Sequence, residues 1–205
     1  MISVIDFGRG NLFSIGQALR HLDLGFEVTA DPYRISRAGR IILPGVGAFK
    51  DAMDSLEKLN LIDPLKRRSE AGVPIVGICL GMQMLVSRST EFGVHDGLDL
   101  ISGTVNRLDD LPGMRIPNVG WRTLSTKPEY HAGLGLAANP DVYFLHSYHV
   151  DLEDQNDKIS TFDFGGRPTT AVIGRDNVLG FQFHPEKSGR AGLEILDGAF
   201  KTYFS

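Results

Sequence analysis

The sequence predicts an α/β protein whose central sheet is mostly parallel and carries an added antiparallel β region. In the first half, short apolar runs alternate with segments in which apolar residues recur at helical spacing. Strands and helices that alternate in this way indicate right-handed βαβ units and a parallel sheet. In the second half, β-rich runs are separated by short turns, which favours mixed or antiparallel strands.

The expected strands of the first half are four apolar runs, at residues 2–6, 26–30, 40–44 and 75–79. Helices are expected where apolar residues recur every three or four positions, at 12–22, 49–59, within 61–72 and at 80–88. Three strands run into glycine-rich turns, DFGRGN, LPGVGAF and GICLGMQ. Because the carboxyl ends of parallel strands share one edge of a sheet, we expect these turns to meet along one rim.

The second half contains four β-rich stretches, at 103–108, 119–125, 142–150 and 169–186. Residues 174–177, Gly-Arg-Asp-Asn, predict a hairpin turn inside the last stretch. Residues 189–204 carry apolar residues at helical intervals and predict a terminal helix packed on the sheet. The loops expected to be most mobile are 109–115 and 152–167.

The composition is that of an ordinary globular chain of 205 residues, with 42% apolar and 22% charged residues. We expect one domain over residues 1–205. A formal net charge of −4 gives no basic surplus for binding nucleic acid or an anionic membrane. The start of the chain lacks the pattern of a signal peptide, and no apolar run reaches the ~18 residues of a membrane span.

The single cysteine excludes an intrachain disulfide framework and any multi-cysteine metal site, and it favours a reducing, cytoplasmic location. His146 and His149 are three apart in an expected strand, which places them on opposite faces and argues against a shared metal ion. The segment GRGNLF lacks the third glycine of a dinucleotide fingerprint, and no P-loop is present. No metal or cofactor is therefore expected.

Cys79 is the middle residue of Gly-Ile-Cys-Leu-Gly, at residues 77–81, which has the spacing of a nucleophile elbow. In such a turn from strand into helix, the flanking glycines relieve backbone crowding and the sulfur is exposed at the rim of the sheet. The helix N-terminus favours the thiolate, and the N–H of Leu80 can stabilise an oxyanion at the same place. The alternative is that Cys79 packs in the interior, as most single cysteines do.

His184 is the best candidate for a base among the six histidines. In extended backbone, residues two apart share a face, so His184 and Glu186 can point the same way, and Pro185 keeps the segment from becoming helical. A carboxylate beside an imidazole orients the ring and stabilises its charged form. Taken alone, this segment is also compatible with an ordinary strand end and a solvated acid; together with the elbow it predicts a Cys79–His184–Glu186 triad.

These residues resemble a known family. GICLGMQML and GFQFHPEKS are similar to the two signatures of class I glutamine amidotransferases, and LPGVGAF resembles the strand that completes their oxyanion hole. The stretches VIDFGRGNL, PNVGW, YFLHSYHV and HPEKSG together resemble the glutaminase subunits of imidazole glycerol phosphate synthase, an enzyme of histidine biosynthesis. The resemblance implies a three-layer α/β fold and extends from the first residues to the last helix.

The resemblance also implies roles for individual residues. Cys79 would attack the side-chain amide of glutamine, His184 would carry the proton, and Glu186 would hold the imidazole. The oxyanion would be bound by backbone N–H groups of Leu80 and of the loop Gly45, Val46 and Gly47, the latter after a peptide flip that glycine permits. Glutamine would be recognised by Gln83, Glu91, Ser147 and Tyr148. From the residues alone, a tight strand-end turn is the favoured interpretation of the loop, and Glu91 is equally a solvated acid.

The partner implied by the resemblance is a (β/α)8-barrel cyclase subunit, which forms a heterodimer with the glutaminase and receives its ammonia through a tunnel. The cyclase combines ammonia with a nucleotide to give imidazole glycerol phosphate and an aminoimidazole carboxamide ribotide. Asn118, Trp121 and Lys187 would face this partner. For Trp121, a place in the core is the alternative to an interface anchor.

Three other functions remain open at this point. A paralogous glutaminase subunit can supply ammonia for the amination of a surface-polysaccharide sugar, because the partner selects the acceptor. A hydrolase of γ-glutamyl or peptide bonds would work without a partner. A non-catalytic binding module would keep the fold, although the intact triad argues against it.

Overall fold

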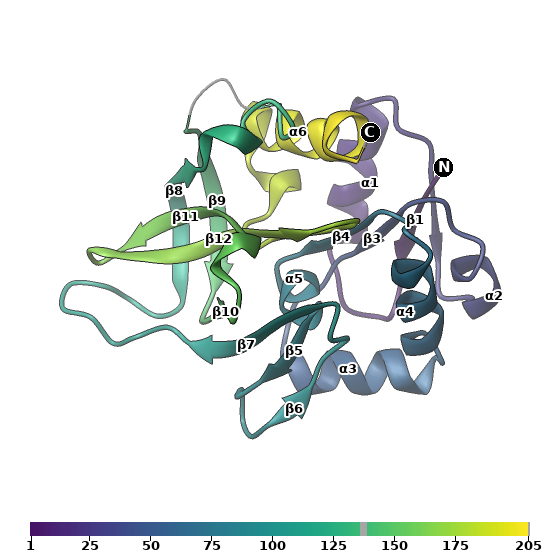
Figure 1. The fold of residues 1–205 in the computed structure, drawn as a ribbon, viewed down its shortest axis with the longest axis horizontal. Coiled ribbons are helices and arrows are strands. Elements are labelled where there is room, and N and C mark those ends of the chain that lie inside the picture. Colours follow the sequence, from purple (N-terminus) through teal and green to yellow (C-terminus); the bar gives the residue numbers. More distant parts are fainter. Residues whose placement is uncertain (136–138, 205) are drawn as a thin grey trace.

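The computed structural model describes residues 1–135 and 139–204, which form a mixed nine-stranded sheet with helices on both faces (Figure 1). The strand order is β2-β1-β3-β4-β13-β12-β11-β8-β9. The first five are parallel to one another: β1 (Ile2–Ile5), β2 (Phe26–Thr29), β3 (Ile41–Leu43), β4 (Ile75–Ile78) and β13 (Val178–Phe181). The rest continue antiparallel: β12 (Arg167–Arg175), β11 (Lys158–Phe164), β8 (Asn118–Thr126) and β9 (Asp141–His146). The predicted α/β class, with a parallel sheet and an antiparallel addition, is confirmed.

Helices cover the two faces of the sheet and bury two separate apolar cores. On one face lie α1 (Leu12–His21), α6 (Gly189–Gly198) and the π-helical turn Ala199–Tyr203 that follows α6. On the other face lie α2 (Pro32–Ile35), α3 (Phe49–Lys58) and α4 (Ile62–Glu70). Within the described residues, every helix is too short or too polar to cross a bilayer.

A second sheet of four strands packs beside α3, in the order β10-β7-β5-β6 (Figure 1). Its strands are β10 (Tyr148–Leu152), β7 (Ile101–Arg107), β5 (Val86–Ser89) and β6 (His95–Asp96). Three short 3-10 turns complete the described chain: Pro128–Tyr130, Gln155–Asp157 and Pro185–Lys187. The hairpin predicted at residues 174–177 is confirmed, because β12 and β13 pair antiparallel around it.

Two predictions of secondary structure were wrong. The helix expected at 80–88 is only α5 (Leu80–Met84), because Val86 and Arg88 leave it to pair with β7 as strand β5. The loop expected at 152–167 contains strand β11, which lies between β12 and β8. Its apolar residues Ile159, Phe162 and Phe164 are buried. Pairing with two neighbouring strands therefore gives a strand to a segment that looked polar in the sequence.

The three glycine-rich turns meet at the carboxyl edge of the parallel strands, as predicted. A Cβ atom on Gly10 would lie 3.2 Å from Cγ of Pro44, and one on Gly45 would lie 3.0 Å from Cβ of Leu80. These distances bring the turn after β1, the loop after β3 and the start of α5 into direct contact.

The turn at Cys79 has the sharp backbone expected of an elbow. Cys79 has φ 55° and ψ −110°, in a region that residues with a Cβ atom rarely occupy. A Cβ atom on Gly81 would lie 1.8 Å from the carbonyl oxygen of Leu43, and one on Gly77 would lie 2.7 Å from the backbone of Gly81. The two flanking glycines are therefore required by close backbone contact.

Replacing Gly81 with alanine should destabilise the fold, because the new methyl group meets fixed backbone. We expect Gly81→Ala to lower the free energy of unfolding by ~3 kcal/mol or more, measured by urea denaturation. Gly39 is the matched control: it has open space around its Cβ position, so Gly39→Ala should change stability by less than about 0.5 kcal/mol. Equal stability of the two variants would contradict this account of the elbow.

Candidate active site

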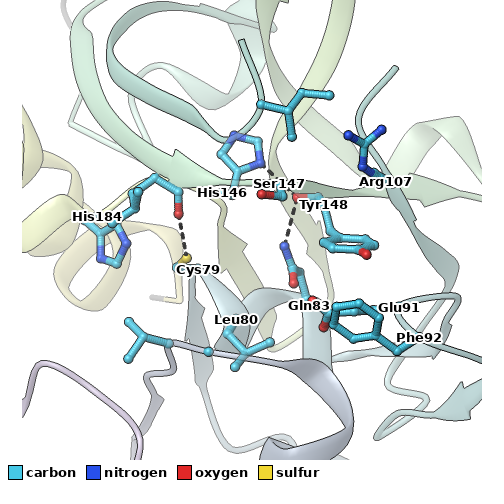
Figure 2. A pocket seen from close by; sticks show the side chains of 14 residues that line it. Cys79, Leu80, Gln83, Glu91, Phe92, Arg107, His146, Ser147, Tyr148 and His184 are labelled. Atoms are coloured by element: carbon cyan, nitrogen blue, oxygen red, sulfur yellow. Dashed lines mark hydrogen bonds between the residues drawn. The ribbon is translucent and has the colours of Figure 1, made fainter. Parts of the chain in front are cut away.

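A cavity of about 510 Å³ opens at the rim where the elbow, the loop after β3 and the β9–β10 corner meet (Figure 2). Nine of the residues singled out in the sequence line it: Val46, Gly47, Cys79, Leu80, Gln83, Glu91, Ser147, Tyr148 and His184. Residues from five separate parts of the chain therefore converge on one space, and the sulfur of Cys79 lies among them.

Cys79 is 7% exposed, and its thiol makes two weak contacts. Sγ lies 3.7 Å from the carbonyl oxygen of Leu145, to which it can donate, and Nε2 of Gln182 donates to Sγ at 3.9 Å. The sulfur also lines the cavity. It is thus mostly enclosed by the protein but accessible to a small molecule in the cavity.

His184 is oriented by Glu186. Nδ1 of the ring lies 2.9 Å from Oε1 of Glu186, and both side chains are almost completely buried. The expected contact is present, but its local structure differs from the expectation. Residues Pro185–Lys187 form a 3-10 turn in which Pro185 takes a first-turn position, so the turn, and not an extended strand, brings Glu186 beside the ring.

The ring of His184 lies beside the sulfur of Cys79 (Figure 2). Burial by itself lowers the pKa of His184, but the contacts with the thiol of Cys79 and the carboxylate of Glu186 outweigh burial and raise this pKa to about 10. Nδ1 is engaged by Glu186, and Nε2 has no hydrogen bond within the described residues. Nε2 is therefore the nitrogen left to exchange a proton with the thiol.

The loop Gly45–Gly47 packs against the elbow. A Cβ atom on Gly45 would come within 3.1 Å of the backbone nitrogen of Gly81, and Gly47 has φ 101°, a conformation that favours glycine. Leu80 is the first residue of α5, so its N–H has no partner inside the helix. Val46 is 42% exposed. The Gly45–Gly47 loop and the first turn of α5 therefore lie side by side at the nucleophile candidate, and both line the cavity.

Gln83 uses both of its side-chain N–H groups inside the protein. They donate to the carbonyl oxygen of Tyr148 at 3.0 Å and to Oε1 of Gln182 at 3.1 Å. Only the carbonyl oxygen of the Gln83 side chain is left for a ligand. The carbonyl oxygen of Tyr148 also accepts from Nδ1 of His146 at 2.8 Å, which fills its two acceptor positions. A ligand contact at Tyr148 would therefore use another group.

Glu91 has a structural role that the sequence did not indicate. Its Oε2 accepts a hydrogen bond of 2.6 Å from the backbone N–H of Phe49, the first residue of α3. The residue before it, Ala48, has no side chain that can cap the helix, so Glu91 supplies the cap from a distance in sequence. Glu91 is 9% exposed and lines the cavity, so it joins the cavity wall to the segment that follows the Gly45–Gly47 loop.

The three residues expected to face a partner differ in position. Trp121 is 53% exposed, and its ring lies edge-on against Tyr143 with centroids 6.0 Å apart, so a core position is excluded. Lys187 is exposed beside Glu186. The expectation for Asn118 was wrong, because this residue is fully buried and its amide is bonded to His146 and Arg122.

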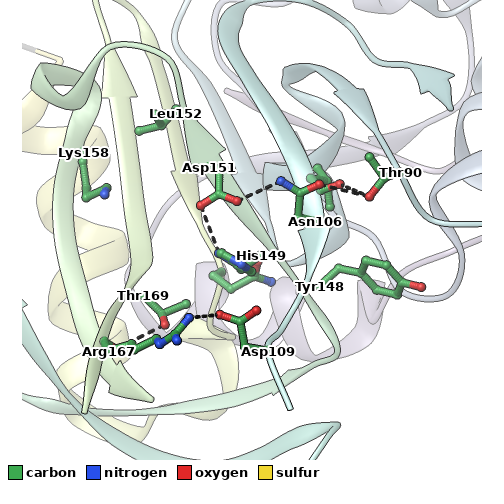
Figure 3. Close-up of polar contacts among 12 residues, drawn as sticks. Thr90, Asn106, Asp109, Tyr148, His149, Asp151, Leu152, Lys158, Arg167 and Thr169 are labelled. Carbon is green, nitrogen blue, oxygen red and sulfur yellow. Dashed lines mark hydrogen bonds and ion pairs between the residues drawn. The ribbon is translucent and has the colours of Figure 1, made fainter. Parts of the chain in front are cut away.

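The expectation that His146 and His149 lie in one strand was wrong. Strand β9 ends at His146 and β10 begins at Tyr148, so Ser147 separates the two strands. The ring of His146 packs against Phe144 and Phe162 at the cavity wall. Nδ1 of His149 lies 3.6 Å from Asp151, which in turn accepts from Asn106 (Figure 3). The two rings therefore make separate sets of contacts. Within the described residues, no cluster of three or more histidine, cysteine or acidic side chains could hold a metal ion.

Sequence reasoning missed several residues around the cavity. Gln182, which contacts both Gln83 and Cys79, comes two residues before His184, so strand alternation could have placed it on the same face. Arg107, Ile116 and Phe92 also line the cavity. They come from β7 and from loops, and no local pattern in the sequence brings them to the rim.

Comparison with known proteins agrees with this architecture. The family model described as glutamine amidotransferase class-I matches residues 3–202. A crystal structure of a glutamine amidotransferase superposes with a TM-score of 0.75 at 17% identity, covering 97% of this chain and 98% of that one. The structure of PurLQS from Thermotoga maritima gives a TM-score of 0.72 at 19% identity, covering 97% and 96%. At these identities, the two structures support the fold alone.

Closer relatives share the name imidazole glycerol phosphate synthase subunit HisH. The protein from Legionella pneumophila (strain Paris), HisH 1, is 42% identical over 204 residues, covering 95% of this chain and 96% of its own length. The Aquifex aeolicus protein is 44% identical over 195 residues, covering 95% and 93%. With a family model that matches nearly the whole sequence and with relatives at this level of identity, the chain belongs to the class I glutamine amidotransferases.

Proposed function

We propose that this chain is the glutaminase subunit of an imidazole glycerol phosphate synthase, acting as one domain over residues 1–205. It hydrolyses glutamine to glutamate and ammonia with Cys79, His184 and Glu186 as the catalytic residues. The observation that carries the proposal is the arrangement of these three groups. The sulfur of the single cysteine, Cys79, lines a cavity. It lies beside the buried imidazole of His184, which the buried carboxylate of Glu186 orients.

The reaction follows from that arrangement in two steps. The thiolate of Cys79 attacks the side-chain amide carbon of glutamine, and the proton on His184 passes to the leaving nitrogen, which departs as ammonia. A glutamyl thioester remains on the sulfur. Water then attacks the thioester while His184 takes one of its protons, and the sulfur leaves as a thiolate beside the protonated ring. Glu186 holds the ring and stabilises its charge in both steps.

Other groups around the cavity stabilise the transition state and bind the substrate. The N–H of Leu80 and an N–H from the Gly45–Gly47 loop bind the oxyanion, after a peptide rotation that the glycines allow. The free side-chain oxygen of Gln83, the carboxylate of Glu91 and the Ser147–Tyr148 segment orient the glutamine. Of these, Glu91 is suited to the α-amino group because it carries a negative charge at the cavity wall.

Ammonia is protonated in bulk water and then ceases to be a nucleophile, so a glutaminase of this kind needs an acceptor subunit at the cavity. The relatives are named as subunits of a synthase, which supports a partner. We infer that the partner is a (β/α)8-barrel cyclase that makes imidazole glycerol phosphate and an aminoimidazole carboxamide ribotide. Trp121 and Lys187, both exposed, form part of the surface that it covers.

Glutamate release should depend on the partner and on the sulfur. We expect the purified chain to hydrolyse glutamine slowly alone, at least ~100-fold faster with the barrel subunit and its nucleotide ligand, and not at all as Cys79→Ala in either state. The physical reason is that oxyanion-hole donors contribute about 10²–10³ in rate, and the peptide rotation that supplies one of them from the Gly45–Gly47 loop takes place only when the partner is bound.

The controls separate this function from its alternatives. Equal activity with and without a partner would indicate an independent hydrolase. Stimulation by the barrel subunit of a sugar-aminating system, and not by the cyclase, would indicate the surface-polysaccharide pathway. Loss of activity in Cys79→Ala has to be measured on a variant whose unfolding curve matches that of the wild type.

The pH profile should change when Glu186 loses its charge. The pKa of His184 is raised to about 10, so the imidazolium that protonates the leaving amide nitrogen persists until that pH and kcat/KM should fall only above it. Glu186→Gln removes the carboxylate that raises this pKa. The fall of kcat/KM at alkaline pH should then begin at a pH lower by roughly one unit or more. The measurement is kcat/KM for glutamine between pH 6 and pH 11 in the activated complex.

The stability of the same two proteins provides a second test. A group whose pKa is raised on folding stabilises the fold below its unfolded pKa, about 6.5, and this contribution is lost as the pH rises toward 10. Wild-type stability should therefore decline over that window more steeply than that of Glu186→Gln. Parallel curves for the two proteins would contradict the charged His184–Glu186 pair.

A further inference from the structure

We propose that His146 is a positioning residue of the glutamine site: together with Asn118 and Arg122 it fixes the backbone corner at residues 145–148 against the nucleophile. The proposal rests on the function proposed above, and it concerns a histidine that does not belong to the triad. Its basis is a continuous line of buried and part-buried hydrogen bonds that starts on strand β8 and ends at the substrate cavity.

The line has three hydrogen bonds, each within ordinary distances. Nε of Arg122 donates to Oδ1 of Asn118 at 3.1 Å, and Nδ2 of Asn118 donates to Nε2 of His146 at 3.0 Å. On the other side of the ring, Nδ1 of His146 donates to the carbonyl oxygen of Tyr148 at 2.8 Å. Because Asn118 can only donate through Nδ2, the ring carries its single proton on Nδ1.

The chemistry of a neutral imidazole suits this place. The ring has to accept at one nitrogen and donate at the other, and only histidine does both with a rigid side chain. His146 is 6% exposed and Asn118 is fully buried. Burial lowers the pKa of His146 to about 4, and His149, His184 and Arg122 act in the same direction against the backbone carbonyl of Tyr148. The ring therefore stays neutral at physiological pH.

The corner that His146 holds contacts the nucleophile directly at one end and is connected to it through two side chains at the other. At one end, the carbonyl oxygen of Leu145 lies 3.7 Å from Sγ of Cys79. At the other, the carbonyl oxygen of Tyr148 also accepts from Gln83, whose amide continues to Gln182 and from there to the sulfur. Figure 2 shows the two hydrogen bonds, from His146 and from Gln83, meeting at this one carbonyl group. Loss of the His146 donor would remove one of the two hydrogen bonds that hold the carbonyl group of Tyr148, while the backbone N–H of Leu108 would still hold the carbonyl oxygen of Ser147 at 2.9 Å.

The outer end of the line lies near the surface proposed to meet the partner. Arg122 is half-buried and follows Trp121 directly on β8. It is the only charged member of the line, and a hydrogen bond from a charged donor is stronger than one between neutral groups. Arg122 thus fixes the Asn118 amide in the orientation that donates to His146.

The test is a set of variants assayed in the activated complex. His146→Phe keeps an aromatic ring beside Phe144 and Phe162, whose centroids lie 5.5 and 5.7 Å from the imidazole, but removes both hydrogen bonds. We expect KM for glutamine to rise about tenfold, the equivalent of ~1.4 kcal/mol, with kcat changing less. His146→Asn restores a short donor toward Tyr148 and should keep KM within about threefold of the wild type.

Two controls isolate the hydrogen bonds from general damage. His131→Phe makes the same replacement at a part-buried histidine that bonds to the carbonyl oxygen of Thr126, away from the cavity, and should leave KM unchanged. Arg122→Met tests the outer end of the line, and its matched control is Arg67→Met at an exposed arginine on α4. We expect Arg122→Met to raise KM by about two- to threefold and Arg67→Met to leave it unchanged.

Either of two results would overturn the proposal. One is a KM within twofold of the wild type for His146→Phe; the other is an equal rise of KM in His146→Asn and His146→Phe, which would show that the donor toward Tyr148 does not set the KM for glutamine. If the wild-type chain released no glutamate, the proposed function would fail and the positioning role would be judged by amide hydrogen exchange. His146→Phe should then speed exchange at residues 145–148 compared with His131→Phe, and unchanged protection would reject the role.

Discussion

The backbone of a single residue, Cys79, determines where everything else in the site has to lie. Its φ of 55° and ψ of −110° place it in a strained region that costs about 1–3 kcal/mol. The strain is held by hydrogen bonds on both sides: its N–H donates to Phe181 at 2.7 Å, and its carbonyl accepts from Gln83 at 3.2 Å. Close packing of Gly77 and Gly81 leaves the chain no other path from β4 into α5.

The register of the sheet then brings the imidazole of His184 to the sulfur. β13 lies beside β4 in parallel, with Phe181 opposite Ile78, so both strands end at the same level of the rim. The residue after β4 is the nucleophile candidate, and the residues after β13 are Gln182 to His184. The backbone N–H of His184 is fixed in turn by the carbonyl of Tyr143 on β9, at 2.9 Å. Two neighbouring strands and one edge strand therefore suffice to align thiol, imidazole and carboxylate.

Local patterns in the sequence predicted the parts of this arrangement that depend on short-range geometry. The glycine spacing around Cys79 and the proximity of His184 to Glu186 follow from a few adjacent residues, and so does the alternation of strand and helix. Long-range pairing was not predictable in the same way. In the sequence, Asn118 has the features of a surface residue in a proline-bounded turn. Its buried position results from the pairing of β8 with β9, which places Asn118 opposite His146. The length of α5 and the place of β11 were likewise set by distant strands.

Glu91 links two parts of the site that the sequence presents as separate. Its carboxylate caps α3 through the N–H of Phe49, two residues beyond Gly47, and it also forms part of the cavity wall. A charged group brought to this carboxylate draws on the same oxygens that hold the start of α3. The position of the Gly45–Gly47 loop and the occupation of the cavity near Glu91 are therefore not independent, because a shift at either one has to be accommodated at the single hydrogen bond between them.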